Sequence, residues 1–225
     1  MLPLAGHPLI AYSIAAAQES ELFSAVVVST DSDEIAEIAR RYGAEVPGLR
    51  PAEIATATSP DIEWVVQAMC DRAEDAFAIL RPTSPFRGAA TIRRAWEQLL
   101  ALGDRADSIR AVELVKQHPG KMWLVDGDLM RPLLDQGLAD VPYHSTQYAA
   151  LPKVYVQNSS LEIAWRRVLT GVHPTIAGAR VAPFVTEGAE GFSIDYPEDV
   201  ERAVQLLAAG AVELSRPVVI PTSLR

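Results

Sequence analysis

The sequence predicts an α/β protein with a doubly wound, mostly parallel sheet. Two apolar runs, at residues 25–30 and 76–80, lack polar alternation, which is typical of strands covered on both faces. Amphipathic stretches with helix start and stop signals lie before and after these runs. Because strands and helices alternate and right-handed crossovers connect such units, we expect helices on both faces of one sheet.

Composition limits the class of protein. The chain has 225 residues, 49% of them hydrophobic and 22% charged, so it can bury a full core. A net charge of −9 argues against a nucleic-acid partner, because phosphate backbones are bound by basic surfaces. The single cysteine, Cys70, excludes an internal disulfide and is expected in the core. Without a signal peptide or a membrane-spanning apolar run, the protein is expected in the cytoplasm, with no membrane partner.

The first half of the chain contains clear boundary signals. Pro8 is suited to the first turn of a helix, and Gly43 is suited to the end of one. Ser59 as N-cap followed by Pro60 predicts another helix start. In chain order we expect a helix over 8–19, a strand over 25–30, a helix over 31–42, an extended piece at 45–46, a helix over 59–73 and a strand over 76–80.

The second half is less regular. Asp126-Gly127 predicts the turn of a hairpin, and residues 131–150 have no periodicity. We expect one domain over 1–215, with an irregular arm at 118–152 that serves as a binding or dimerisation segment, and a flexible tail over 216–225. The remaining predicted elements are a helix over 90–102, strands over 109–115, 154–156, 161–165 and 179–185, a strand-like run at 192–194 and a helix that begins at Pro197.

Polar residues follow several of the predicted strands. Asp31 follows the first strand, the loop 81–87 follows the second, residues 157–160 follow a third, and Asp195 follows the last. In an open α/β sheet such loops meet at the edge where ligands bind. Pro82 and Pro85 stiffen the loop 81–87, so its hydroxyls and two guanidiniums would be placed in advance for an anion. A turn with solvated arginines is an equally good reading of the same residues.

Asp195 has two readings. It is a candidate metal or hydroxyl ligand, but local sequence slightly favours a helix cap before Pro197. The sequence lacks the motifs of several other functional classes: the Walker loop, G-x-G-x-x-G, a metal-protease histidine pair and C-x-x-C. The four histidines show no ligand spacing, and we expect them on the surface or in loops.

Several segments resemble one family. Pro3-Leu4-Ala5-Gly6-His7-Pro8-Leu9-Ile10 is similar to "R-P-L-x-G-K-P-L-I", and Val27-Val28-Ser29-Thr30-Asp31-Ser32 is similar to "V-V-S-T-D-D". Residues 42–47 and 50–53 follow in register, 82–87 resemble "Q-P-T-S-P-L-R", and 193–199 resemble "D-I-D-T-P-E-D". Together these segments are similar to the acylneuraminate cytidylyltransferases, or CMP-sialic acid synthetases, and their legionaminic and pseudaminic relatives.

The resemblance implies a Rossmann-like fold of the nucleotide-diphospho-sugar transferase type and a Mg²⁺-dependent reaction. In that reaction CMP passes from CTP to a nonulosonic acid, and pyrophosphate is released. It also implies a homodimer formed through the irregular arm. By resemblance, the residues and roles are Asp195 for catalysis and metal binding, Asp31 and Arg50 for nucleotide binding, and Arg81, Thr83, Ser84, Arg87, Gln157 and Asn158 for substrate binding.

The chain departs from the family pattern at several positions. Ser193 replaces the first of two metal-binding acids, and a hydroxyl is a poorer Mg²⁺ ligand than a carboxylate. Arg81 replaces a glutamine, and Ser159 and Glu162 replace a glycine and a tyrosine. The family's opening strand and basic glycine-containing loop do not precede Met1, so we expect a longer natural chain. Two alternatives stay open: a non-catalytic relative that binds a sugar acid or a partner protein, and a nucleotidyltransferase acting on an ordinary sugar phosphate.

Overall fold

The computed structural model describes residues 2–138, 140–170 and 173–221. The chain divides into two compact units. One comprises Met1–Ala111 together with Asn158–Arg225, and the other comprises Val112–Gln157. The irregular arm expected at 118–152 falls within the second unit.

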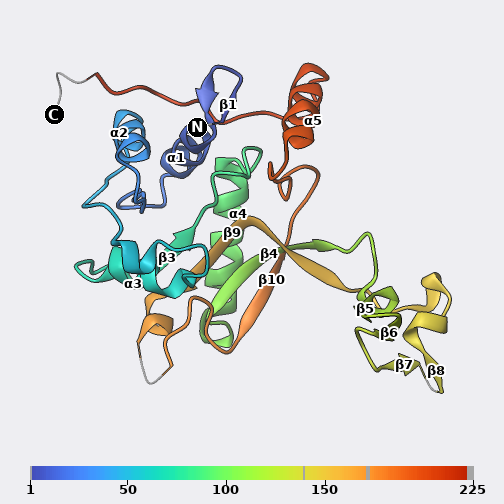
Figure 1. Cartoon of the computed structure of the whole chain (residues 1–225). Helices are drawn as coiled ribbons and strands as arrows, with labels where there is room; N and C mark the ends of the chain where they lie inside the picture. The colour runs from blue at the N-terminus through green and yellow to red at the C-terminus, as the bar shows by residue number, and fades with distance from the viewer. Residues whose placement is uncertain (1, 139, 171–172, 222–225) are drawn as a thin grey trace. The chain divides into compact units, whose positions relative to one another are not determined.

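A four-stranded sheet forms the centre of the first unit, in the strand order β10-β4-β9-β3 (Figure 1). The expectation of a mostly parallel sheet is wrong: the sheet is mixed, because β9 runs antiparallel to β3, with Phe77 opposite Ala164. An unbroken apolar run shows that both faces of a strand are covered, but it does not reveal the strand's direction. The strands are β3 Ala76–Ile79, β4 Ser108–Leu114, β9 Tyr155–Trp165 and β10 Val181–Val185.

Strand β9 replaces two predicted strands and the loop between them. Residues 157–160 were expected to be a loop because they are polar, yet β9 continues through them. Asn158 Nδ2 donates to Thr186 Oγ1 at 3.0 Å, and the Ser160 amide donates to Asn158 Oδ1 at 3.2 Å. Polar side chains are compatible with a strand when they find such partners.

Helices cover both faces of this sheet. Alternate β3 residues point to opposite faces: Phe77 and Ile79 pack with α3 (Asp61–Met69), whereas Ala78 packs in the cluster that contains α4 (Ala89–Leu102). The α4 cluster also contains buried β9 and β4 residues, and Leu99 and Ile109 in it are fully buried. Helices on both faces are therefore confirmed for the central sheet.

Helix α1 (Leu9–Ser20) is almost entirely buried and links two further clusters. Ile10 and Ile14 pack against α2 (Asp33–Arg41), and Leu9 and Tyr12 lie in the cluster that contains α5 (Pro197–Ala208). The start of α2 follows the prediction, because Ser32 Oγ accepts from the Ile35 amide as N-cap. In α3 the N-cap is Pro60, and Ser59 Oγ instead accepts from the Thr56 amide.

The segment 25–30 does not form the predicted strand. Its only bridge among the described residues is a parallel one between Val27 and Glu45. A cavity of about 520 Å³ lies between this segment and β3, and both line it. Val26 and Val28 pack against the cluster of α1 and α2 residues and also line the cavity, so the apolar cover expected for this segment is incomplete.

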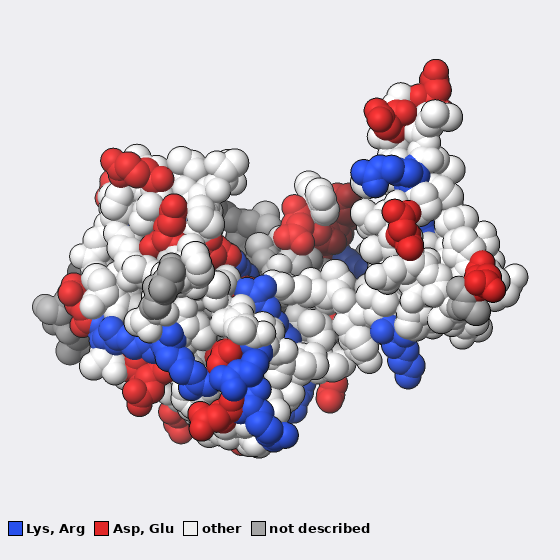
Figure 2. Space-filling model, turned by 90° about the horizontal axis from the view of Figure 1, so that it is seen from below, with Lys and Arg blue, Asp and Glu red and all other residues white. Residues whose placement is uncertain are grey.

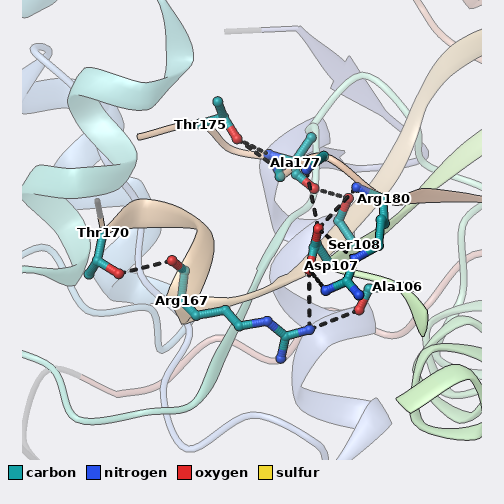
Figure 3. A network of polar contacts seen from close by, with 10 residues as sticks. Ala106, Asp107, Ser108, Arg167, Thr170, Thr175, Ala177 and Arg180 are labelled. Carbon is teal, nitrogen blue, oxygen red and sulfur yellow. Dashed lines mark hydrogen bonds and ion pairs between the residues drawn. The ribbon is translucent and has the colours of Figure 1, made fainter. Parts of the chain in front are cut away.

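Asp107, just before β4, ties three segments together (Figure 3). Its carboxylate accepts from Arg180 Nη2 at 2.7 Å, from Arg167 Nη2 at 3.3 Å and from the amides of Ala179 and Arg180. These contacts outweigh the cost of burial and hold the pKa of Asp107 well below its usual range, with the Arg180 guanidinium as the main cause. The network fixes the start of β4 against the residues that lead into β10.

The second unit is built from two hairpins. In β5 (Trp123–Asp126) and β6 (Leu129–Pro132) Asp126 pairs with Leu129, so the turn residues are Gly127, with φ +57°, and Asp128. The hairpin is confirmed, one residue later than the predicted turn. A second, shorter hairpin joins β7 (Gly137–Leu138) to β8 (Val141–Pro142).

His118 lies in a loop of this unit, in agreement with the expectation of a surface or loop histidine, but it is buried, with 3% exposure. Its Nδ1 accepts from the Gly120 amide at 3.0 Å, and its Nε2 lies 3.0 Å from the Pro152 carbonyl oxygen. The ring therefore fixes two loop segments by hydrogen bonds.

The C-terminal segment is bonded to helices α1 and α2. Residues 216–221, in the predicted tail, have backbone anchors: the amides of Arg216 and Ile220 donate to Glu19 Oε1 and to the Arg41 carbonyl. Residues 222–225 lie outside the described residues. The short elements are β1 Pro3–Leu4, β2 His7–Pro8 and the 3-10 helices Ala52–Ile54, Gly103–Arg105, Pro119–Lys121, Tyr143–Ser145, Tyr148–Ala150 and Arg166–Leu169.

No described helix is long and apolar enough to span a membrane. Cys70 is exposed at the end of α3, so the prediction of a core cysteine is wrong. The apolar face of α3 ends at Met69, which is buried, and the next residue is already at the C-cap. On the face shown in Figure 2, Lys and Arg side chains are interspersed with Asp and Glu. The local charge of a cavity therefore depends on its own lining residues rather than on the net charge.

Candidate functional site

The loop 81–87 follows β3, as predicted, but its residues differ in accessibility. Ser84 and Arg87 are 0% and 1% exposed. Arg87 Nη1 donates to the Ser160 carbonyl and Nη2 donates to Ser13 Oγ, both at 2.7 Å. Burial lowers the pKa of Arg87 to about 9, which still leaves the guanidinium charged at neutral pH. The structure thus places Arg87 behind the loop, where it joins the loop to β9 and α1.

Thr83 connects this loop to the stretch that contains Asp195. Its carbonyl accepts from the Ile194 amide at 2.8 Å. The run 192–194 does not form the strand expected there, and this bond fixes its position instead. The loop 81–87 and the residues around Asp195 therefore lie side by side, as the site prediction requires.

Asp195 does not act as the helix cap that local sequence favours. The carboxylate of Asp199 does so, since its Oδ2 accepts from the amides of Asp195 and Tyr196 at 3.1 and 2.9 Å. Asp195 is exposed. Ser193 Oγ is buried and has no hydrogen-bond partner among the described residues. One exposed carboxylate and one unsatisfied hydroxyl are thus available within three residues.

Arg50 and Arg81 both line the 520 Å³ cavity. Arg50 Nε donates to Ser29 Oγ at 3.1 Å, and its Nη2 donates to the Ser29 carbonyl at 2.8 Å. Arg81 forms an ion pair with Asp61 on α3, in which both terminal nitrogens donate to the carboxylate. The two predicted basic residues are thereby brought to one cavity, together with Ser13 and Pro82.

The other predicted residues are less closely associated. Asp31 is exposed, one residue before the N-cap of α2, and is not among the lining residues of this cavity. Asn158 lies on β9 and bonds Thr186. Gln157 is an exposed residue of the second unit.

Three residues near the arginines were not among the predicted site residues, although Glu162 was noted as a departure from the family pattern. Glu162 on β9 is 8% exposed, and burial raises its pKa even though Arg110 and Arg81 oppose the shift. Its Oε2 lies 2.7 Å from Arg110 Nη2. Asp61 and Trp64 line the cavity from α3. A signal for this pair was available: an acid in the first turn and an aromatic residue three positions later face the same side of a helix.

A sequence model of the family described as "Cytidylyltransferase" matches residues 1–216. The chain belongs to this cytidylyltransferase family. Its cavity and its two arginines are therefore features of a cytidylyltransferase domain.

Two relatives and one solved structure illustrate the similarity. The chain is 38% identical over 168 residues to the CMP-N,N'-diacetyllegionaminic acid synthase of Legionella pneumophila, covering 72% of this chain and 68% of that protein. It is 43% identical over 95 residues to the N-acylneuraminate cytidylyltransferase of Escherichia coli, covering 42% of this chain and 22% of that protein. A structure of CMP:2-keto-3-deoxy-manno-octonic acid synthetase complexed with CTP superposes with a TM-score of 0.62 over 93% of this chain and 91% of that chain. At 13% identity, this last match shows the fold alone.

Proposed function

We propose that this cytidylyltransferase transfers CMP from CTP to the anomeric hydroxyl of a sialic-, legionaminic- or pseudaminic-type nonulosonic acid. The sugar oxygen bonds to the α-phosphorus, the bond from that phosphorus to the β-phosphate oxygen breaks, and the hydroxyl proton passes to solvent as pyrophosphate leaves. The observation that carries the proposal is the 38% identity to a CMP-legionaminic acid synthase, which extends over 72% of the chain.

The charges of the cavity support an anionic substrate. Arg50 and Arg81 give it two guanidiniums, in a chain whose net charge is −9. Guanidinium groups recognise carboxylates and phosphates through paired N–H donors. We assign Asp31 to the nucleotide, and Thr83, Gln157 and Asn158 to the sugar acid. Arg50 and Arg81, expected at the nucleotide and at the sugar acid respectively, line one cavity, so both would face an oxyanion of the same substrate. Ser84 and Arg87, also predicted as substrate-binding, would act from within the fold by holding the loop 81–87.

Mg²⁺ fits the donor set if the nucleotide supplies most of the ligands. Among the described residues, no group of three or more acidic, histidine or cysteine side chains is arranged so that it could hold a metal ion. Mg²⁺ in nucleotide-dependent enzymes is commonly bound by one or two carboxylates and by substrate phosphates. Asp195 would supply the carboxylate. Bound Mg²⁺ would neutralise charge on the phosphates, while Arg50 and Arg81 bind and orient the substrates.

We also propose that the second unit forms a homodimer contact. It exposes large apolar side chains on its hairpin strands, including Val125, Leu129 and Met130, which are 76%, 78% and 59% exposed. Apolar side chains gathered on one small unit are typical of a surface that another protein covers.

Pyrophosphate release tests the proposed function directly. The protein is incubated with CTP, Mg²⁺ and, in turn, N-acetylneuraminic, legionaminic and pseudaminic acids. We expect release with at least one acid, none without an acid, and a strong loss in Arg50→Met. Absence of release with all three acids, from protein that is folded by circular dichroism, would contradict the proposal.

A second function is favoured by one observation: Ser193 stands where the resembling enzymes have an acid. A non-catalytic relative would bind the sugar acid without binding CTP. Calorimetric titration with each ligand alone separates the two functions, because the transferase binds both.

A further inference from the structure

Four side chains form one connected group at the cavity: Asp61 and Trp64 from α3, together with Arg50 and Arg81. Trp64 Nε1 donates to Asp61 Oδ1 at 2.8 Å. The same carboxylate accepts hydrogen bonds from both terminal nitrogens of Arg81. The guanidinium carbons of Arg50 and Arg81 lie 5.5 and 6.0 Å from the centre of the Trp64 ring. The indole ring therefore lies within cation–π distance of both guanidiniums, and Asp61 bonds both the ring and the Arg81 guanidinium.

Each guanidinium is fixed along one edge only. Arg50 uses Nε and Nη2 on Ser29, and Arg81 uses its two terminal nitrogens on Asp61. Within the described part of the chain, Arg50 Nη1 and Arg81 Nε have no hydrogen-bond partner. Both arginines thus keep at least one donor for a ligand, at a position that is set before the ligand arrives.

The group carries two positive charges and one negative charge. Asp61 and Arg81 side chains are 32% and 35% exposed, so a solute can reach them. Burial opposes the charge of Asp61, but hydrogen bonds from Arg81 and Trp64 outweigh it and lower the pKa of Asp61. The carboxylate stays ionised at neutral pH, and one positive charge is left over for an anion.

We propose that Asp61 and Trp64 are positioning residues that hold Arg50 and Arg81 as a two-guanidinium site for an oxyanion of the substrate. The oxyanion is either the carboxylate of the sugar acid or a phosphate of CTP. This inference rests on the proposed function for the identity of the ligands, but the placement of the four side chains does not.

Asp61 could affect anion binding through its charge or by positioning Arg81, and the two effects change the affinity in opposite directions. A negative charge beside an anion site repels the anion, so removing it should tighten binding if charge alone decides the affinity. Holding a long side chain in its binding pose lowers the entropy lost on binding, so removing the holder should weaken binding. Asp61→Asn keeps the size of the side chain and an oxygen for Trp64, and it removes the ion pair. The sign of its effect therefore separates the two explanations.

The experiment measures Kd by calorimetry for CTP alone and for each of the three sugar acids alone, in separate arms. We expect Asp61→Asn to raise Kd about tenfold in one of the arms, and Trp64→Phe, which loses the Nε1 donor but keeps a ring, to raise Kd several-fold in the same arm. Glu63→Gln, an exposed charge removal on the same helix, is the matched control and should change nothing. The arm that responds identifies the oxyanion.

Catalysis and fluorescence give independent readouts. In the pyrophosphate assay, Asp61→Asn should raise KM for the responding substrate and leave kcat within a few-fold. The ligand-induced change in tryptophan emission should disappear in Trp64→Phe. Unchanged or tighter binding in Asp61→Asn, or failure of the native protein to bind either ligand class, overturns the inference. Failure of turnover by a protein that binds the anion and responds to Asp61→Asn would overturn the proposed function instead.

Discussion

In the proposed Mg²⁺ site, Ser193 and Asp195 would determine how tightly the protein holds the cation. Asp195 offers an exposed carboxylate, and Ser193 offers a buried hydroxyl without a partner among the described residues. We predict that Ser193→Asp raises Mg²⁺ affinity about tenfold, because a second carboxylate is a far better ligand for Mg²⁺ than a hydroxyl. Titration of Mg²⁺ into the protein with bound CTP measures the change.

Ser159→Asp is the control for this variant, since it adds the same charge at an exposed β9 position. An equal gain in both variants would mean that general charge, rather than a local ligand, is responsible. No gain in Ser193→Asp would show that residues 193–195 are structural.

The lowered pKa of Asp107 should make the free energy of unfolding depend on pH in the acidic range. Its pKa is lowered in the native state, so its stabilisation is present above the ordinary value near 4 and is lost as pH falls toward the native value. We expect Asp107→Asn to lower the free energy of unfolding by about 2 kcal/mol at pH 7, because each carboxylate oxygen accepts hydrogen bonds and the amide nitrogen of asparagine, itself a donor, cannot replace either oxygen. The side chains of Arg167 and Arg180 are about half exposed, so solvent screening limits what their ion pairs with Asp107 add to stability.

Urea unfolding at pH 7 and at pH 3 tests this. The difference between native protein and Asp107→Asn should shrink at the lower pH. Asp71→Asn, at an exposed position, should match the native protein at both. A difference that does not depend on pH would mean that Asp107 acts through packing and not through its charge.

At the scale of elements, Arg87 joins the loop 81–87 to β9 and α1. Arg87→Met keeps the apolar stem but leaves the Ser160 carbonyl and Ser13 Oγ without their donor. We predict a loss of about 3 kcal/mol in the free energy of unfolding, which is the usual effect of removing a buried charged donor. Arg93→Met, which removes exposed bonds to the α1 carbonyls, should cost less than about 1 kcal/mol. Thermal unfolding compares them, and equal losses would contradict a special role for Arg87.

Some helices and strands could be predicted from local sequence, whereas others depend on contacts between distant segments. Boundary signals for α2 and the turn of the first hairpin were good predictors, because caps and tight turns depend on a few neighbouring residues. The prediction divided β9 into two strands because residues 157–160 are polar. The bond from Asn158 to Thr186, which is remote in sequence, could not be foreseen. Strand direction in the central sheet was likewise decided by pairing between distant segments.

The candidate site also contains some residues that sequence motifs identified and others that they did not. Motif positions led to Arg50 and Arg81, which do line one cavity. Accessibility could not be inferred from those motifs: Ser84 and Arg87 are buried by contacts with other segments. Asp61 and Trp64 were missed because their significance comes from Arg81, which lies 20 residues after Asp61 in the chain.

At the scale of the whole molecule, the proposed homodimer requires the second unit to present a surface that a second copy can cover. Val125 and Met130 are a cross-strand pair of β5 and β6, so their side chains lie on the same face of the hairpin. Both are more than half exposed. If a second copy covers this face, the pair contributes about 3 kcal/mol to association, which corresponds to more than a hundredfold in Kd.

We therefore predict that the double variant Val125→Lys with Met130→Glu shifts the protein from dimer to monomer. The opposite charges of the new pair preserve an attractive cross-strand contact, so the hairpin itself should remain folded. Leu100→Lys, a similar change at a 49% exposed position of α4, is the control and should remain dimeric. Analytical ultracentrifugation over a dilution series measures the equilibrium. A monomeric native protein would reject the dimer, and a double variant that stays dimeric would place the contact on another surface.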